Sequence, residues 1–196
     1  VNTVGNNLMH YKFPSFPQKK NPVSDFIPVA RFSDMLLNPN KKINYNGKVL
    51  VYPDIKIVYW AGGNPFHHHQ DINKMIKAWK KPETIIINDW CWNTTAKFAD
   101  IILPCTTTFE RDDISISGYD NYIVSMEKAI QPIGLAKDDY EIFSNLASLM
   151  GVNHEFTEGK KAKDWQEKIY DECRKILMKR NKDIPMYDEF RKKKMV

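Results

Sequence analysis

The feature that most constrains the fold is an apolar run that stops abruptly at two glycines. Residues 56–70 read KIVYWAGGNPFHHHQ, so the run ends at Gly62 and Gly63 and is followed by Asn64 and Pro65. Such a run is typical of a buried strand, and both glycines can adopt the positive φ angles of a tight loop. A helical pattern begins near Asp71. The sequence therefore predicts a strand, a glycine loop and a helix in succession.

This arrangement predicts a candidate nucleotide site formed by Gly62, Gly63 and Asn64. In α/β sheets, nucleotides bind beyond the carboxyl ends of the strands, because free backbone N–H groups and the helix N-terminus favour phosphate there. An ordinary tight turn explains the same residues, and this alternative stays open at this point. The loop does not match the GxGxxG fingerprint, since His67 stands where its third glycine is expected, and this disfavours an ordinary nicotinamide site.

A second strand and a crossover helix complete a parallel pair. Apolar residues recur at helical spacing between Ile72 and Trp79, and the β-branched run TIIIN at 84–88 predicts a strand covered on both faces. A further short helix capped by Asn93 and a strand over 100–103 follow. The pattern predicts a Rossmann-like, three-layer α/β domain with a mostly parallel sheet flanked by helices.

The remaining segments predict smaller elements around this core. We expect a short helix over 29–37, a hairpin turning at Asn46-Gly47, a strand over 122–126, and helices over 138–150 and 162–180. In the first of the two later helices, the residues spaced to pack inward are Tyr140, Phe143, Leu146, Ala147 and Met150. The chain then divides into an irregular lead-in with a short helix and hairpin (1–53), a cofactor-binding core (54–160) and a C-terminal helix and tail (161–196).

Charge, hydropathy and cysteine spacing disfavour a nucleic-acid surface, a membrane span and an iron–sulfur site. The net charge of +5 comes largely from scattered lysine pairs without an aromatic-rich binding motif, which disfavours a nucleic-acid surface. The sequence contains no apolar stretch of membrane-spanning length and no signal-peptide core. The three cysteines, Cys91, Cys105 and Cys173, have no CxxC or other metal spacing, so we expect free, buried thiols and no iron–sulfur cluster built from this chain.

The three consecutive histidines at 67–69 raise the question of a metal site. Neighbouring side chains diverge, and no acidic or cysteine ligand follows at helical spacing, so a metal site is disfavoured. Histidines at the N-terminus of a helix could instead donate hydrogen bonds to a phosphate.

Several long blocks, in order, resemble one family. They are WAGGNPFHHHQD, AWKKPETIIIND, TTAKFADIILPCTTTFERDDI and AKDDYEIFSNLA, which run from Trp60 to Ala147. Together with FIPVARFSDMLLNP and YNGKVLVYPDIK upstream, they resemble the molybdopterin oxidoreductases of the dimethyl sulfoxide reductase family. The greatest similarity is to its trimethylamine-N-oxide and biotin sulfoxide reductases. Such enzymes run to several hundred residues, so the chain resembles an internal fragment.

The resemblance implies further cofactor-binding residues. It singles out His68 as a contact to the pyranopterin guanine dinucleotide. Asp89, at the end of the second strand, could take two hydrogen bonds from a ribose diol or a guanine edge, or cap the next helix, and the resemblance favours nucleotide binding. Arg111 could pair with its neighbouring carboxylates or hold phosphate, and the family's matching loop contacts the cofactor. Asp139 matches a guanine-side position, with helix capping as its alternative.

The function implied is that of the cofactor-binding domain of a molybdenum reductase of S-oxides or N-oxides. The cofactor implied is molybdenum bis(molybdopterin guanine dinucleotide). Nothing in the chain matches the family's molybdenum-ligating serine, so we expect no catalytic residue and no metal ligand here, and no activity from the 196 residues alone. The family implies further domains of the same enzyme and a c-type cytochrome donor as partners. It favours a periplasmic location, with cytoplasmic relatives known. The alternative function is a stand-alone nucleotide-binding or protein-interaction α/β module.

Overall fold

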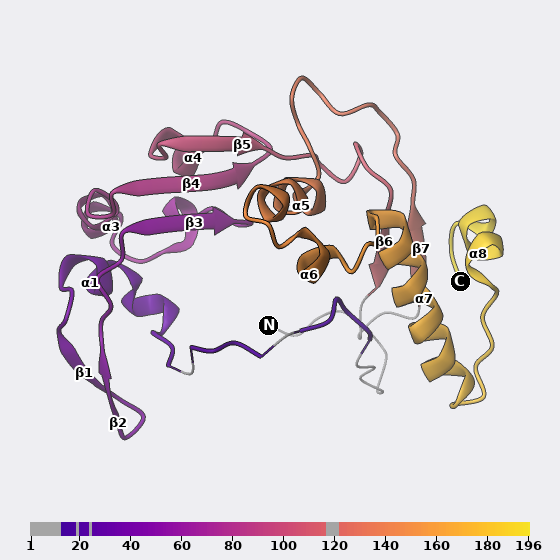
Figure 1. Cartoon of the computed structure of the whole chain (residues 1–196), viewed down its shortest axis with the longest axis horizontal. Helices are drawn as coiled ribbons and strands as arrows, with labels where there is room; N and C mark the ends of the chain where they lie inside the picture. Colours follow the sequence, from indigo (N-terminus) through magenta and orange to yellow (C-terminus); the bar gives the residue numbers. More distant parts are fainter. Residues whose placement is uncertain (1–12, 19, 24, 117–121) are drawn as a thin grey trace. The chain divides into compact units, whose positions relative to one another are not determined.

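The computed structural model describes residues 13–18, 20–23, 25–116 and 122–196. These residues form two compact units, shown in Figure 1. One unit comprises the described residues from 20 to 105, and the other combines residues 13–18 with the described residues from 106 to 196. We call them the sheet unit and the C-terminal unit and describe each by itself.

The sheet unit contains the expected succession of strands and helices. Its elements are the 3-10 helix η1 (Val29–Arg31), helix α1 (Phe32–Leu37), strands β1 (Lys42–Tyr45), β2 (Lys48–Val51) and β3 (Ile57–Ala61), helices α2 (Pro65–His68) and α3 (Ile72–Trp79), strand β4 (Thr84–Asp89), helix α4 (Thr94–Lys97) and strand β5 (Ile101–Pro104). Helix α3 begins where the sequence indicated, because the Asp71 side chain accepts a hydrogen bond from the Lys74 backbone N–H at 3.0 Å.

Strands β3, β4 and β5 form a parallel sheet in that order (Figure 1). Val58 pairs with Ile85 and Trp60 with Ile87, so these four side chains share one face of the sheet. Helices α2, α3 and α4 cover this face, and the buried core comprises Val58, Phe66, Met75, Trp79, Ile85, Ile87 and Ala96. The predicted α/β fold with a parallel sheet flanked by helices is confirmed.

The opposite face of the sheet is less covered than the sequence suggested. Ile57 is 61% exposed and Ile101 45% exposed, while Tyr59 and Ile86 are half-buried. The expectation that β4 is covered on both faces is therefore wrong for Ile86. Three consecutive isoleucines fix the strand but cannot specify what packs on each side of it.

The β1–β2 hairpin follows the predicted turn chemistry. Asn46 and Gly47 form its two-residue loop with φ angles of 48° and 75°, and the strands pair from Lys42 with Val51 to Tyr45 with Lys48. After the hairpin, the buried Tyr52 hydroxyl donates to Asp34 of α1 at 2.9 Å. This bond and the ion pairs from Lys41 and Lys74 hold the pKa of Asp34 below its usual value.

The C-terminal unit combines a small antiparallel sheet with helices. Its elements are strands β6 (Asp113–Ile116) and β7 (Ile123–Met126) and helices α5 (Asp139–Leu149), α6 (Asn153–Thr157), α7 (Ala162–Met178) and α8 (Tyr187–Lys193). Its core joins β7, α7 and α8 through Ile123, Tyr170, Cys173, Leu177, Tyr187 and Phe190. Tyr170 and Phe190 stack with ring centroids 4.4 Å apart.

Two expectations for this unit need correction. Leu146 is 40% exposed and Met150 68% exposed, although their spacing suggested inward packing. Helix α5 buries Ala147, as expected, together with Ile142, which the predicted stripe did not include. Strand β6 and helices α6 and α8 were not expected, and α8 lies within the predicted tail. The expected three-part division of the chain stays a prediction.

The cysteines occupy three different environments. Cys173 is buried, Cys105 is intermediate and Cys91 is exposed, so the expectation of buried thiols is wrong for Cys91. No described cysteine forms a disulfide. Within the described ranges, no helix is both long and apolar enough to cross a membrane.

Candidate functional site

Five of the candidate residues lie at one edge of the parallel sheet. Strands β3, β4 and β5 run in the same direction, so their carboxyl ends at Ala61, Asp89 and Pro104 share an edge (Figure 1). Gly62, Gly63, Asn64 and His68 follow β3, and Asp89 is the last residue of β4. The structure therefore brings these residues to the edge where α/β folds bind nucleotides.

The glycine loop has the backbone that the sequence predicted. Gly62 and Gly63 have φ angles of 81° and 75°, which a residue with a Cβ adopts only with strain. The Trp60 indole Nε1–H donates to the Gly62 carbonyl oxygen at 2.8 Å and fixes the loop's direction. Both glycines are exposed, and a Cβ built on Gly62 would meet nothing within 4 Å. The loop thus presents open backbone at the sheet edge.

Asn64 connects the glycine loop to the next part of the fold. Its Oδ1 accepts a hydrogen bond of 2.6 Å from the hydroxyl of Thr95, which belongs to α4 and is 1% exposed. Asn64 is the N-cap residue of α2, but its side chain makes no capping hydrogen bond. Among the described residues, its Nδ2 donates to no partner, so the amide can still donate to a ligand.

The histidines lie on a short helix that the sequence did not reveal. His67 and His68 form the last turn of α2, and the three histidines precede Asp71, the N-cap of the expected helix α3. The exposed His68 lies at the glycine loop, because a Cβ on Gly63 would come within 3.5 Å of its Cε1. His69 packs against Phe32 and Trp60, and burial, together with the neighbouring His68, lowers its pKa.

Asp89 organises the turn that follows β4. Its Oδ1 accepts hydrogen bonds from the backbone N–H groups of Trp90 at 2.9 Å and Cys91 at 3.3 Å. Its Oδ2 accepts from the side-chain amide of Asn93 at 2.6 Å, and Asn93 in turn caps α4 by accepting from Ala96 N–H. Asp89 is only 9% exposed, so its carboxylate is largely withdrawn from solvent. Its carboxylate has a structural role whether or not it also contacts a ligand.

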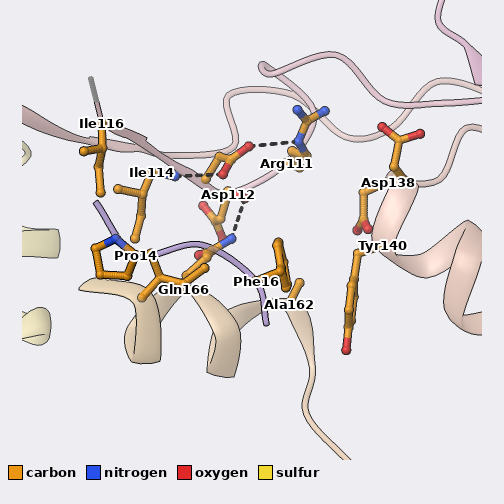
Figure 2. Close-up of a pocket in the computed structure, with 13 residues that line it drawn as sticks. Pro14, Phe16, Arg111, Asp112, Ile114, Ile116, Asp138, Tyr140, Ala162 and Gln166 are labelled. Carbon is orange, nitrogen blue, oxygen red and sulfur yellow. Dashed lines mark hydrogen bonds and ion pairs between the residues drawn. The ribbon is translucent and has the colours of Figure 1, made fainter. Parts of the chain in front are cut away.

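The other two candidate residues meet in the C-terminal unit. Arg111 and Asp139 both line a cavity of about 320 Å³, together with Pro14, Phe16, Asp112, Asp113, Ile114, Ile116, Asp138, Tyr140, Ala162, Gln166 and Ile169. Figure 2 shows Asp138 and Tyr140 at one end, Ile114, Ile116 and Pro14 at the other, and Arg111 and Phe16 between them. The cavity combines aromatic and apolar surface with one guanidinium and several carboxylates.

Arg111 is held in place by neighbouring groups. Its Nη1 donates to the Thr106 carbonyl oxygen at 2.7 Å, and its Nε donates to Asp113 at 3.2 Å. The pairing with a neighbouring carboxylate that the sequence suggested is therefore present. These bonds orient the guanidinium and use only part of its five N–H donors. In the described residues, Nη2 has no hydrogen-bond partner and can still donate.

The two aspartates at the start of α5 have different positions. Asp138 is the N-cap, and its Oδ1 accepts from the Glu141 backbone N–H at 2.8 Å. Asp139 is the first helical residue and is exposed. The capping alternative thus applies to Asp138, while Asp139 lines the cavity without serving as the cap.

Sequence reasoning missed Glu110, which shapes the loop beside Arg111. Its carboxylate accepts from the N–H and hydroxyl of Thr107 at 2.7 and 2.8 Å and from Ile133 N–H at 2.8 Å. These bonds, with the Thr107 backbone N–H first among them, lower the pKa of Glu110. Only the two bonds from Thr107 are local, so the sequence carried no signal for the contact with Ile133. No group of three or more potential metal ligands occurs among the described side chains.

Comparisons with known proteins show which family the chain is similar to. A model of the molybdopterin oxidoreductase family matches residues 2–149. The chain is 44% identical over 180 residues to a biotin sulfoxide reductase from Cereibacter sphaeroides, covering 91% of this chain and 24% of that protein. It is 46% identical over 166 residues to a trimethylamine-N-oxide reductase from Haemophilus influenzae, covering 83% of this chain and 20% of that protein.

A solved structure shows the same fold. The acetylene hydratase from Pelobacter acetylenicus superposes with a TM-score of 0.57 at 19% identity, covering 74% of this chain and 18% of that one. The chain spans between a fifth and a quarter of the length of the two curated relatives described above. Because the family model covers most of the chain, this protein belongs to the molybdopterin oxidoreductase family.

Proposed function

We propose that this chain binds a guanine dinucleotide tail of a molybdenum–pterin cofactor. Membership of the family implies a molybdenum–pterin cofactor. The observation that carries the finer proposal is the exposed glycine loop, with Gly62 and Gly63 at positive φ, the free amide donor of Asn64 and the imidazole of His68 on one sheet edge. Open backbone and neutral or cationic donors suit a pyrophosphate.

The cavity of the C-terminal unit suits a guanine base. A carboxylate such as Asp139 can accept hydrogen bonds from the N1–H and the 2-amino group of guanine together. The remaining guanidinium donors of Arg111 suit the O6 and N7 acceptors of the base or a phosphate oxygen. Tyr140 and Phe16 offer ring faces at the same cavity, and their centroids lie 6.1 Å apart. We assign Arg111 and Asp139 to cofactor binding on this basis.

For the whole protein, we propose reduction of an S-oxide or N-oxide, such as biotin sulfoxide, trimethylamine N-oxide or dimethyl sulfoxide. When bound, the molybdenum–pterin cofactor would supply the redox chemistry, and the residues described here would bind and orient its nucleotide tail. The support comes from relatives whose names give these substrates. We further propose that the cofactor is the bis(guanine dinucleotide) form. We also propose that this chain holds no iron–sulfur cluster. For the whole protein, we likewise propose a c-type cytochrome as the electron donor and a periplasmic location.

The test compares two neighbouring histidines in the full-length enzyme. His68→Ala removes the imidazole beside Gly63, whereas His67→Ala removes another exposed imidazole from the same turn of α2. A charge-assisted contact is worth roughly 1.5–3 kcal/mol, so we expect His68→Ala to weaken cofactor retention by about tenfold to a hundredfold. His67→Ala should retain the wild-type content. The measurements are pterin and guanosine monophosphate released per protein, with the melting temperature of each variant.

Two results would count against the proposal. Wild-type enzyme that releases pterin without any guanine nucleotide would remove the dinucleotide form. Equal cofactor content in both histidine variants would remove the glycine-loop edge from the binding site. Arg111→Ala, compared with Arg174→Ala on α7, provides the same contrast for the cavity, since Arg174 binds the Ile184 carbonyl and Asp183 outside it.

A further inference from the structure

Two tryptophans at the sheet edge expose most of their surface. Trp90 and Trp92 directly follow Asp89, the last residue of β4, and are 67% and 68% exposed. The other tryptophans behave differently, since Trp79 and Trp165 are each 2% exposed and Trp60 packs against Phe32 and Trp79. In the described part of the chain, neither indole pairs with another aromatic ring or a cation, and neither Nε1–H donates a hydrogen bond.

These indoles are exposed on a fixed turn. The Asp89 carboxylate binds the N–H of Trp90 itself and of Cys91, and the Asn93 N–H donates to the Cys91 carbonyl oxygen at 2.9 Å. The Asn93 amide closes the turn by donating to Asp89 at 2.6 Å. The backbone on both sides of each indole is therefore tied to the end of β4. Such a turn presents the indoles with little loss of backbone entropy when a ligand covers them.

The turn also lies close to the glycine loop. Strand β4 pairs directly with β3, with Ala61 beside Asn88, so the two strand ends are adjacent. The hydrogen bond from Thr95 to Asn64 connects the segment after the turn to the glycine loop. Large, rigid, exposed aromatic surface is costly in water and is typical of binding sites for flat ligands.

We propose that Trp90 and Trp92 stack on a planar heterocycle of the bound cofactor, either its pterin or its guanine. This inference rests on the proposed function and adds two binding residues to it. Ring stacking requires a flat partner and tolerates different heterocycles, since each of them presents a π-face. The indole Nε1–H groups can also donate to ring nitrogen or carbonyl acceptors.

The test uses the full-length enzyme and separates planarity from apolar contact. Trp90→Phe and Trp92→Phe keep a flat ring, whereas Trp90→Leu and Trp92→Leu keep only an apolar side chain. We expect the leucine variants to release pterin roughly five- to a hundredfold faster than wild type, because lost stacking appears mainly in the dissociation rate. The phenylalanine variants should stay near the wild-type rate. Phe26→Leu is the matched control, because Phe26 is 63% exposed and contacts Tyr45 of the hairpin.

A binding measurement identifies the heterocycle. Titration of the cofactor-free enzyme with guanosine monophosphate, or with a simple pterin, should quench indole emission with one of them, and the leucine variants should lose that quenching. Wild-type release rates in both leucine variants would overturn the inference. Equal release from the phenylalanine and leucine variants would also overturn it, because apolar contact would then suffice. If wild-type enzyme held no pterin at all, the proposed function itself would fail.

Discussion

At the scale of single residues, Asp89 illustrates how one carboxylate can organise a site edge. Sequence reasoning left two roles open for it, a contact to nucleotide or a cap of the next helix. The structure shows it buried and bonded to two backbone N–H groups and to Asn93, which is itself the cap of α4. Its contribution to the fold is therefore larger than that of an exposed loop carboxylate.

We predict that Asp89→Ala destabilises the protein more than loss of an ordinary cap does. The substitution leaves three donors without their acceptor in a site that is 9% exposed. A hydrogen bond to a charged group contributes roughly 1.5–3 kcal/mol, and water can hydrate the donors of the exposed Trp90 and Cys91 in the variant, so we expect a loss of about 2–3 kcal/mol in the free energy of unfolding. Chemical denaturation of each variant measures this difference.

Asp71→Ala is the matched control for Asp89→Ala. Asp71 is exposed and accepts from one backbone N–H, that of Lys74, so we expect a loss of about 1 kcal/mol. Equal losses in the two variants would contradict the organising role of Asp89. If the Asp89→Ala enzyme melts like wild type yet loses its cofactor, Asp89 acts in ligand binding alone.

At the scale of elements, the glycine loop and the hairpin turn provide a direct comparison. Gly62 and Gly47 have similar φ angles, 81° and 75°, and a Cβ on either would meet nothing within 4 Å. We predict that Gly62→Ala and Gly47→Ala each lower the free energy of unfolding by about 1–2 kcal/mol, the cost of left-handed backbone. Only Gly62→Ala should also lower cofactor content, because its methyl group would occupy the approach to the loop.

Thermal melts and released pterin, measured on the same preparations, test this comparison. Loss of cofactor from Gly47→Ala to the same extent would mean that both variants act through stability. Retention of cofactor by Gly62→Ala would mean that no ligand closely approaches the glycine loop.

Elements with a strong local signal could be predicted from the sequence, and the others could not. The three parallel strands, the Asn46-Gly47 hairpin and the starts of α3, α4 and α5 follow from apolar runs, turn residues and capping side chains. Helix α2 spans only four residues, too few to show a helical period. Helix α8 buries only Tyr187 and Phe190, which is too sparse a pattern to read.

The candidate site was predictable to the same degree. The glycine loop has the expected backbone because positive φ is a property of the glycines themselves. The roles of Asp89 and Glu110 depend on partners such as Asn93 and Ile133, which folding brings close. How far the less covered face of the β3–β4–β5 sheet is buried likewise depends on what packs there, which a run of isoleucines does not encode.

At the scale of the whole molecule, the cysteines report on the two units separately. Cys91 and Cys105 belong to the sheet unit, and Cys173 belongs to the core of the C-terminal unit. Burial raises the pKa of the Cys173 thiol to about 11. At pH 8, only roughly one molecule in a thousand would therefore carry the reactive thiolate at this position.

We predict stepwise labelling by a thiol reagent at pH 8. Cys91 should react first because it is exposed, Cys105 more slowly, and Cys173 only when the C-terminal unit unfolds. All three should react in denaturant without prior reduction. Mass spectrometry of labelled peptides gives the order, and rapid native labelling of Cys173, or a need for reductant, would contradict this description.

The hydrogen bond between Thr95 and Asn64 also has a consequence for how the family can vary. The Thr95 hydroxyl is nearly inaccessible to water, and Asn64 Oδ1 is the acceptor that the structure gives it. A change at either position leaves a polar atom at the other without its hydrogen-bond partner, unless the second position changes too. Homologues should therefore show correlated substitution at positions 64 and 95, thirty-one residues apart, even where both neighbourhoods diverge.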